Sequence, residues 1–319
     1  MRGGRIVVTD HAFGAVDHER AVAEQHGRNL EVFQCSTVAE TVEAVRGADV
    51  VFVNFAPISA EVIAALPPAA TVIRYGIGYD NVDIDAARRQ GIRVCNVPDY
   101  GADTVADHAV ACLLGLLRRT GEFTAVIRDR GWISSNGLGP IRGFGETTVG
   151  LVGTGRIGRA VIARLRPFGF EIIAHDPFVD EDSLRALGVE SVTLQELFAR
   201  SHAISLHVPL TAQSRGLIDA DALAEMGEGT VLVNTSRGGL VDEAAVADAL
   251  ASGRLAGVAL DVFDPEPLAH DSALRGLSNV ILTPHAAFFS ESSLSALQRL
   301  AAEEAGRALN HAPLRCQVA

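Results

Sequence analysis

Residues 149–158, VGLVGTGRIG, constrain the fold of this chain more than any other stretch. A short β-branched run leads into Gly153, Gly155 and Gly158, which have the G-x-G-x-x-G spacing of a dinucleotide-binding turn. The spacing alone is weak evidence, because 31 glycines in 319 residues produce it by chance. The motif also lies almost halfway along the chain, so the residues before it need an explanation of their own.

A dinucleotide-binding turn needs a strand before its glycines, a helix after them and an acidic residue at the end of the next strand. TVGLV, RIGRAVIARLRPFG and Asp176, which follows EIIAH, meet these three conditions. Gly153 would permit the tight turn, Gly155 the approach of a pyrophosphate and Gly158 close helix–strand packing. Asp176 would bind the adenosine ribose and repel a 2′-phosphate, which predicts NAD rather than NADP. The alternative is a structural glycine turn with an incidental aspartate.

The whole chain alternates short β-branched runs with amphipathic stretches, which is typical of parallel sheets covered on both faces. A first series of strands is expected at 6–9, 50–53, 71–75 and 92–97, and a second at 148–153, 171–175, 203–208, 230–235, 257–262 and 280–285. Helices are expected at 38–46, 83–90, 156–168, 194–200, 242–251 and 290–310. The pattern predicts an α/β fold of two doubly wound parallel-sheet domains.

A long helix over 101–121 is predicted to connect the two series. Asp103 or Thr104 could cap its start, and Arg118 and Arg119 suit its C-terminal end. The following residues, 131–143, are rich in glycine and lack periodicity, so they predict an exposed arm or loop.

Composition excludes several classes of function. The net charge of −12 argues against a nucleic-acid or anionic-membrane surface. The chain contains no lysine, which excludes Schiff-base chemistry, a Walker-type lysine and a lysine base. Four cysteines without paired spacing predict no metal site and reduced thiols. No signal peptide or membrane span is apparent, so we expect a cytoplasmic protein.

Three titratable or charged residues lie at or just beyond strand ends in the second series: Arg237 in VNTSRGG, Glu266 in LDVFDPEP and His285 in LTPHAA. The carboxyl ends of parallel strands line the ligand crevice of such a sheet. Arg237 could instead be a structural ion-pair partner, Glu266 a solvated turn residue, and His285 one of ten mostly structural histidines.

Together the three would suit hydride transfer between NADH and a 2-oxo acid. A guanidinium binds a carboxylate through two parallel hydrogen bonds. Histidine can donate a proton to the developing alkoxide, and a neighbouring carboxylate can keep the imidazole charged and oriented.

From about residue 72 onward the chain resembles the D-isomer-specific 2-hydroxyacid dehydrogenase family. The segments RYGIGYDNVDI, VGLVGTGRIG with Asp176, VNTSRGGLVDE, and ALDVFDPEPL with LTPHAA occur in the family's order. They are most similar to the C-terminal-binding protein and phosphoglycerate dehydrogenase branches. The resemblance implies a flavodoxin-like substrate-binding domain formed by 1–99 and 287–319. It also implies an inserted Rossmann NAD domain at 100–286, with a dimerisation arm at about 120–145.

The resemblance also assigns roles by position. Arg237 would bind the substrate carboxylate, with His285 as acid/base and Glu266 as its partner. The cofactor residues would be Gly153, Gly155, Arg156, Ile157, Gly158, Asp176, Val208, Pro209, Thr235, Ser236, Arg237, Asp261 and His285, with Asp261 on the carboxamide. Substrate contacts would come from Asn54, Arg74, Gly76, Ile77, Gly78, Arg237 and His285. Several relatives carry a hydroxyl residue at position 77, so only the main chain of Ile77 could serve here.

These features predict an NAD-dependent enzyme that acts on a small 2-oxo or 2-hydroxy acid and forms a homodimer. One alternative is an NAD-sensing, corepressor-like interaction protein. Another is a dehydrogenase of a phosphonate or phosphorylated acid, with Arg74, Asn54 and the arginines of the arm meeting a second anion. Arg74 could equally be structural, and Phe288 and Phe289 could line an apolar pocket instead.

Overall fold

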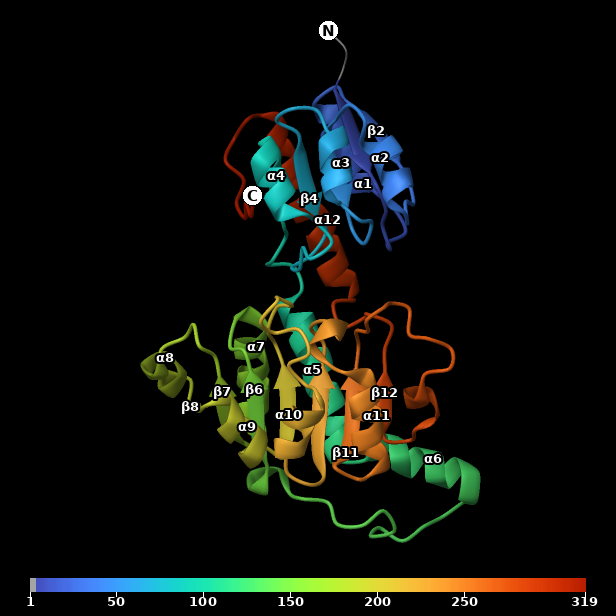
Figure 1. Cartoon of the computed structure of the whole chain (residues 1–319), viewed down its shortest axis with the longest axis vertical. Helices are drawn as coiled ribbons and strands as arrows, with labels where there is room; N and C mark the ends of the chain where they lie inside the picture. Colours follow the sequence, from blue (N-terminus) through green and yellow to red (C-terminus); the bar gives the residue numbers. More distant parts are fainter. Residues whose placement is uncertain (1–3) are drawn as a thin grey trace. The chain divides into compact units, whose positions relative to one another are not determined.

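The computed structural model describes residues 4–319, which form two compact units (Figure 1). The first unit contains the described residues up to Gly101 together with Phe289–Ala319, and the second is Ala102–Phe288. The boundaries expected from the sequence were 99/100 and 286/287.

The first unit is a five-stranded parallel sheet with strand order β2-β1-β3-β4-β5, the flavodoxin-like order. Its strands are β1 (Arg5–Val8), β2 (Asn29–Val32), β3 (Ala48–Val53), β4 (Thr71–Arg74) and β5 (Arg93–Cys95). One face carries α2 (Val38–Val45), α3 (Ala60–Ala65) and α4 (Ile84–Gln90). The other carries α1 (Asp17–Gln25) and α12 (Glu291–Leu309). The C-terminal helix therefore belongs to the unit that begins the chain.

The second unit is a seven-stranded parallel sheet with strand order β12-β11-β10-β9-β6-β7-β8. Its strands are β6 (Thr148–Val152), β7 (Glu171–His175), β8 (Glu190–Ser191), β9 (Ala203–Leu206), β10 (Thr230–Asn234), β11 (Leu255–Leu260) and β12 (Val280–Leu282). The chain reverses direction across the sheet between β6 and β9, as in a Rossmann domain. The predicted fold class, two doubly wound parallel sheets, is confirmed.

Helices cover both faces of this second sheet because its strands are apolar on both sides. α5 (Ala102–Leu117), α7 (Arg156–Leu165) and α8 (Glu181–Ala186) pack on one face. α9 (Leu194–Arg200), α10 (Ala220–Glu225) and α11 (Glu243–Ala251) pack on the other. All five residues of β6 are buried, and its side chains alternate between the two cores. Short 3-10 helices complete the unit: η1 (Phe144–Glu146), η2 (Arg166–Phe168), η3 (Gly238–Leu240) and η4 (Ala273–Gly276).

The helix predicted over 101–121 is wrong at its C-terminal end. α5 stops at Leu117, and Arg119 adopts a left-handed conformation with φ +53° before a separate helix, α6 (Thr120–Arg130). The Arg119 side chain, expected to stabilise a helix end, instead pairs with Glu122 and donates to the carbonyl of Leu138.

The start of α5 also differs from the prediction. Neither Asp103 nor Thr104 is an N-cap, because α5 already begins at Ala102. Asp103 and Asp107 instead bind the guanidinium of Arg164 on α7, which ties the two helices together.

The predicted arm has two parts. α6 has no buried residue, and 131–143 contain neither helix nor strand. Ile127 and Trp132 are 45% and 90% exposed there, so this segment presents apolar surface.

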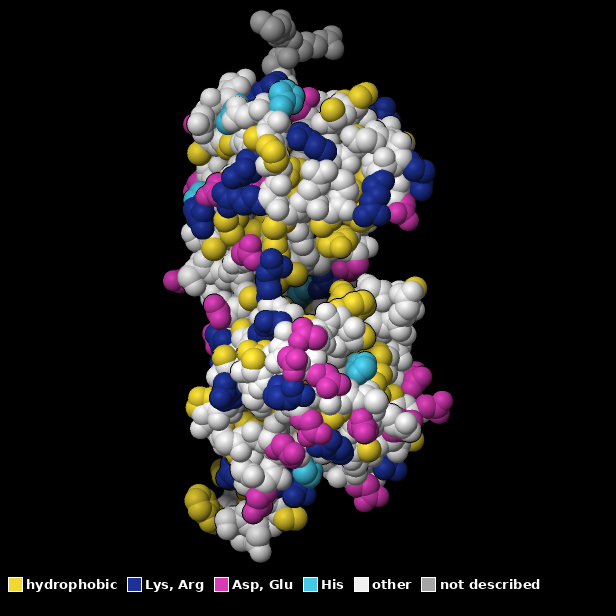
Figure 2. Space-filling model, turned by 90° about the vertical axis from the view of Figure 1, so that its left-hand side faces the viewer, with side chains coloured by type: hydrophobic (Ala, Val, Ile, Leu, Met, Phe, Trp, Pro, Cys, Tyr) yellow, Lys and Arg dark blue, Asp and Glu magenta, His cyan; other side chains and the backbone are white. Residues whose placement is uncertain are grey.

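The described surface carries both signs of charge. Figure 2 shows acidic and arginine side chains interspersed on the face that it draws, without a continuous basic area. Within residues 4–319, every helix is too short or too polar to span a membrane.

Candidate active site

The turn after β6 and the first turn of α7 each require a glycine. Gly153 has φ +91°, and a Cβ there would lie 2.7 Å from the carbonyl oxygen of His207. A Cβ on Gly158 would lie 2.3 Å from the carbonyl oxygen of Gly153, so the helix packs directly against the turn. A Cβ on Gly155 would meet nothing within 4 Å, which leaves open space beside the backbone. These three glycines therefore match the roles expected of a dinucleotide-binding turn.

The N-terminus of α7 suits a phosphate group. Gly155 is its N-cap, and among the described residues no side chain caps it and no acidic residue lies in its first turn. Arg156 and Ile157 begin the helix. The first amide groups and the helix dipole therefore favour an anion at this end. Arg159 holds the turn in shape, since its Nε donates to the carbonyl oxygen of Thr154 at 3.0 Å.

Asp176 directly follows β7 and is hydrogen-bonded to the glycine turn. Its Oδ2 accepts from the amide and hydroxyl of Thr154 at 2.7 and 2.8 Å, and its Oδ1 accepts from the amide of Phe178. Burial raises the pKa of Asp176, but these hydrogen bonds outweigh it and lower the pKa overall. A carboxylate that stays ionised at this point favours a ribose 2′-hydroxyl over a 2′-phosphate. The arrangement thus fits NAD.

His207 follows β9 and lies directly behind the glycine turn. Both of its ring nitrogens are buried, and neither has a hydrogen-bond partner among residues 4–319. Burial lowers the pKa of His207 from 6.5 to about 4. The ring is therefore neutral at physiological pH.

Acidification is expected to destabilise the second unit through His207. The pKa of His207 is about 4 in the folded state and 6.5 in the unfolded state, so the unfolded chain binds a proton first as the pH falls. The second unit therefore keeps its full stability above the unfolded pKa and loses the contribution of the neutral ring as the pH falls through the folded pKa. The free energy of unfolding should fall by up to about 1.4 kcal/mol per pH unit across that range. Thermal unfolding followed by circular dichroism measures it, and the transition that NAD⁺ raises identifies the second unit. His207→Gln should flatten this dependence, and an unchanged slope in that variant would contradict the assignment.

The turn after β10 places Arg237. The side chain of Asn234 closes the turn, since its Nδ2 donates to the Arg237 carbonyl at 2.8 Å and its Oδ1 accepts from the Ser236 amide at 3.0 Å. The guanidinium Nη1 of Arg237 donates to the Ser236 carbonyl. A Cβ on Gly238 would lie 2.0 Å from the carbonyl carbon of Phe263. Glycine is therefore required for the β10 turn to approach the segment that carries Glu266.

His285 and Glu266 form a direct pair. The Nδ1 atom of His285 lies 2.9 Å from Oε2 and 3.1 Å from Oε1 of Glu266, and the two side chains are 23% and 33% exposed. The Phe263 amide donates to Oε1 of Glu266 at 3.1 Å and holds the carboxylate in place. The ring of Phe288 meets the imidazole edge-on at a centroid distance of 6.2 Å. The imidazole orientation is thus set by a carboxylate and an aromatic ring.

The charges around Glu266 keep it ionised. Partial burial raises the pKa of Glu266, but the hydrogen bond and charge of His285, the Phe263 amide and the charge of Arg237 together lower it. Arg237, Glu266 and His285 therefore form one electrostatic group within the second unit. Chemically, the group can bind an anion and transfer a proton beside it.

The remaining cofactor candidates lie at the same carboxyl edge of this sheet. Thr235 and Ser236 follow β10, and the buried hydroxyl of Thr235 has no partner among the described residues. Val208 and Pro209 follow β9. Asp261 is buried and its carboxylate accepts from the amides of Ala286 and Ala287, so the carboxamide contact stays a prediction.

The candidates in the first unit lie at the carboxyl edge of its own sheet. Asn54 follows β3 and Arg74 ends β4, where both are buried. A Cβ on Gly76 would lie 1.9 Å from Nη1 of Arg74, so the guanidinium packs on this glycine. The Ile77 carbonyl accepts from the side chain of Asn96 at 2.7 Å. The substrate roles of these residues and of Gly78 stay predictions.

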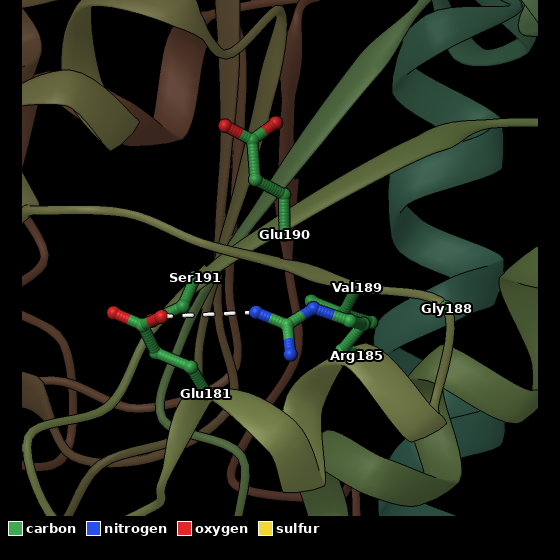
Figure 3. Close-up of a pocket in the computed structure, with 6 residues that line it drawn as sticks. All are labelled: Glu181, Arg185, Gly188, Val189, Glu190 and Ser191. Carbon is green, nitrogen blue, oxygen red and sulfur yellow. Dashed lines mark ion pairs between the residues drawn. The ribbon is translucent and has the colours of Figure 1, made fainter.

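A shallow pocket of the second unit contains none of the predicted residues (Figure 3). It is lined by Glu181, Arg185, Gly188, Val189, Glu190 and Ser191, and Arg185 is paired with Glu181 and Asp182. Within residues 4–319, no cluster of three or more histidine, cysteine or acidic side chains is arranged to hold a metal ion.

The interpretation of the sequence missed Asn234 as a residue that shapes the site. Asparagine at a strand end, followed by Thr-Ser-Arg, is a turn signal, because its short amide side chain bonds to backbone nearby.

Comparison with known proteins places this chain in a family. Residues 110–287 match the family model of the D-isomer specific 2-hydroxyacid dehydrogenase NAD-binding domain. D-3-phosphoglycerate dehydrogenase of Mycobacterium leprae is 45% identical over 243 residues, which are 76% of this chain and 46% of that protein. The chain thus spans about half the length of that relative.

Two further relatives match most of their own length. Glyoxylate reductase of Korarchaeum cryptofilum is 41% identical over 249 residues, 77% of this chain and 75% of that protein. The crystal structure of D-lactate dehydrogenase from Aquifex aeolicus complexed with NAD and lactic acid is similar with a TM-score of 0.86 at 25% identity, covering 96% of each chain. The chain, with its NAD-binding turn, belongs to the D-isomer-specific 2-hydroxyacid dehydrogenase family.

Proposed function

We propose that the protein is an NAD-dependent D-2-hydroxyacid dehydrogenase that interconverts a small 2-oxo acid and the corresponding D-2-hydroxy acid. The observation that carries the proposal is the His285–Glu266 pair, which lies in the same unit as Arg237 and the dinucleotide-binding turn. The retained pair gives no support to the alternative of an interaction protein that only senses NAD.

NAD would be held by the glycine turn, the N-terminus of α7 and Asp176. When bound as NADH, the cofactor supplies the hydride that reduces the substrate carbonyl carbon. In that direction Arg237 binds the substrate carboxylate through two parallel hydrogen bonds. His285 donates the proton on Nε2 to the carbonyl oxygen, which becomes the hydroxyl oxygen of the product. Glu266 accepts a hydrogen bond from Nδ1 and so orients the ring.

A panel of 2-oxo acids tests the proposal. It would contain small, aromatic, phosphorylated and phosphonate-bearing acids, including glyoxylate and 3-phosphohydroxypyruvate, which the names of the relatives suggest. We expect NADH consumption with at least one small 2-oxo acid and slower consumption with NADPH. No consumption with any of them would contradict the proposed function.

We also propose that α6 and 131–143 form a homodimer contact. Two observations support this proposal. The apolar side chains of Ile127 and Trp132 are exposed, and no residue of α6 is buried. We also propose substrate contacts from the first unit: the main chain at Gly76, Ile77 and Gly78 for the substrate carboxylate, and Asn54 and Arg74 for a second anionic group.

A further inference from the structure

The backbone of His285 is held in a conformation that side chains rarely adopt. Its φ is +53°, in the left-handed region. Residues other than glycine stay in this region only where surrounding contacts hold them there. The amide of His285 donates to the carbonyl oxygens of Asp261 at 2.7 Å and Thr283 at 3.0 Å. The residues that hold this backbone therefore also set the position of the imidazole.

The carboxylate of Asp261 fixes the two residues that follow His285. Its Oδ1 accepts from the amide of Ala286 at 2.8 Å, and its Oδ2 accepts from the amide of Ala287 at 2.9 Å. The side chain is 1% exposed, so water does not compete for these bonds. A buried carboxylate that binds successive amides is a strong anchor for a turn.

The position of Asp261 is in turn fixed by Thr283 and His108. Leu260 of β11 pairs with Leu282 of β12, which puts Asp261 beside Thr283 at the two strand ends. The hydroxyl of Thr283 is hydrogen-bonded to Oδ1 of Asp261 and lies 3.1 Å from Nε2 of His108.

The direction of these bonds follows from their chemistry. A carboxylate only accepts, so the single hydroxyl proton of Thr283 points to Asp261. The hydroxyl oxygen then accepts from His108, whose Nε2 must carry a proton. Donation thus runs in one direction, from His108 through Thr283 to Asp261.

One face of α5 lies against this carboxylate. Cys112 follows His108 by one helical turn, and its thiol pKa is raised to about 11, first by burial and then by the charge of Asp261. The helix that supplies His108 is also packed on β10 and β11. A helix packed on the sheet of the second unit therefore carries the first donor of the chain of hydrogen bonds.

We propose that His108 and Thr283 are positioning residues for His285, acting through the Asp261 carboxylate and the amides of Ala286 and Ala287. The chain of hydrogen bonds keeps the left-handed turn closed and the imidazole against Glu266. The consequence for turnover rests on the proposed function, whereas the effect on the turn does not.

Thr283→Val tests the proposal in the whole 319-residue chain, because valine keeps the shape of the side chain and removes the hydroxyl. We expect kcat to fall by about 10- to 100-fold, since a small misplacement of a reacting group has effects of this size. The Kd for NADH should change less than kcat, because the glycine turn, α7 and Asp176 supply most of the expected cofactor contacts and Asp261 only one of them. Amide hydrogen exchange in the 284–288 segment should become faster, because the anchor of two of its amides is weakened.

Conservative and coupled variants separate positioning from general destabilisation. Thr283→Ser keeps the hydroxyl. Its kcat and its amide exchange rate at 284–288 should therefore be close to those of the wild type. His108→Gln offers an amide donor near the position of Nε2 and should retain more kcat than His108→Leu. In the Thr283→Val background His108→Leu should have little further effect, because both changes break the same hydrogen-bond chain.

His202→Leu is the matched control. It removes a histidine that accepts a hydrogen bond from the Thr148 amide at 3.0 Å, at the opposite, amino-terminal end of the strands. It should lower the thermal stability without changing kcat or exchange at 284–288. An equal loss of kcat in this control would overturn the proposal.

The remaining outcomes are also decisive. Wild-type exchange at 284–288 in Thr283→Val, or equal defects in Thr283→Ser and Thr283→Val, would overturn the proposal. If the wild-type protein reduces no 2-oxo acid, the proposed function fails, and the exchange result alone still supports or overturns the hydrogen-bond chain.

Discussion

Replacing His285 with asparagine should lower kcat by about 10²- to 10⁴-fold, the usual contribution of a positioned acid or base. Asparagine can still accept or donate a hydrogen bond, but it cannot transfer a proton to the substrate oxygen. NADH binding should be largely retained, because the glycine turn, α7 and Asp176 supply most of the expected cofactor contacts. Steady-state kinetics with the best 2-oxo acid and a fluorescence titration with NADH measure the two effects.

His270→Asn provides the control for this change. His270 is an exposed histidine of the same unit, in the segment that follows β11, and no role is assigned to it. It should leave kcat unchanged. Turnover near the wild-type level in His285→Asn would contradict the acid/base assignment.

Arg237→Lys should lower kcat/KM by about 10- to 100-fold, because one of two charge-assisted hydrogen bonds to the substrate carboxylate is lost. An ammonium keeps the positive charge but cannot reproduce the planar, two-pronged contact. The KM for the 2-oxo acid should rise, while the KM for NADH changes less. Initial rates at varied concentrations of each substrate separate these effects.

Arg185→Lys is the comparison for the same exchange of side chains at a different place. Arg185 is paired with Asp182 and Glu181 on α8, and its side chain is 69% exposed. Exposed ion pairs contribute little to stability. Because Arg185 also lies outside the predicted site, kcat/KM should not change in this variant. Unchanged kinetics in Arg237→Lys would argue against its role as the carboxylate-binding group.

Most strands were predictable because their side chains are buried on both faces of a parallel sheet, whereas the edge strands β2 and β8 were missed, since β2 has no buried residue and β8 has only two residues. Runs such as 148–152 are mostly apolar and do not alternate with polar residues, which is typical of strands buried on both faces. The break between α5 and α6 was not predictable in this way. Leu117 to Gly121 continues a pattern compatible with a helix, and the left-handed Arg119 is held by its contacts with Glu122 and the Leu138 carbonyl.

The residues of the candidate site were likewise predictable only in part. Glu266 and His285 could be named from their places after β11 and β12, since neighbouring parallel strands end at the same edge. His108 and Thr283 could not, because nothing local marks a histidine within an apolar helix as the partner of a hydroxyl 175 positions away. Such contacts arise only when the helix packs on the sheet.

A crystal structure of the protein with NADH and oxamate, an unreactive analogue of a 2-oxo acid, tests the central claim most directly. The account predicts that the oxamate carboxylate forms two hydrogen bonds with the guanidinium of Arg237, and that the carbonyl oxygen lies within hydrogen-bond distance of Nε2 of His285. Oxamate bound away from Arg237, or an imidazole turned away from the carbonyl oxygen, would contradict it.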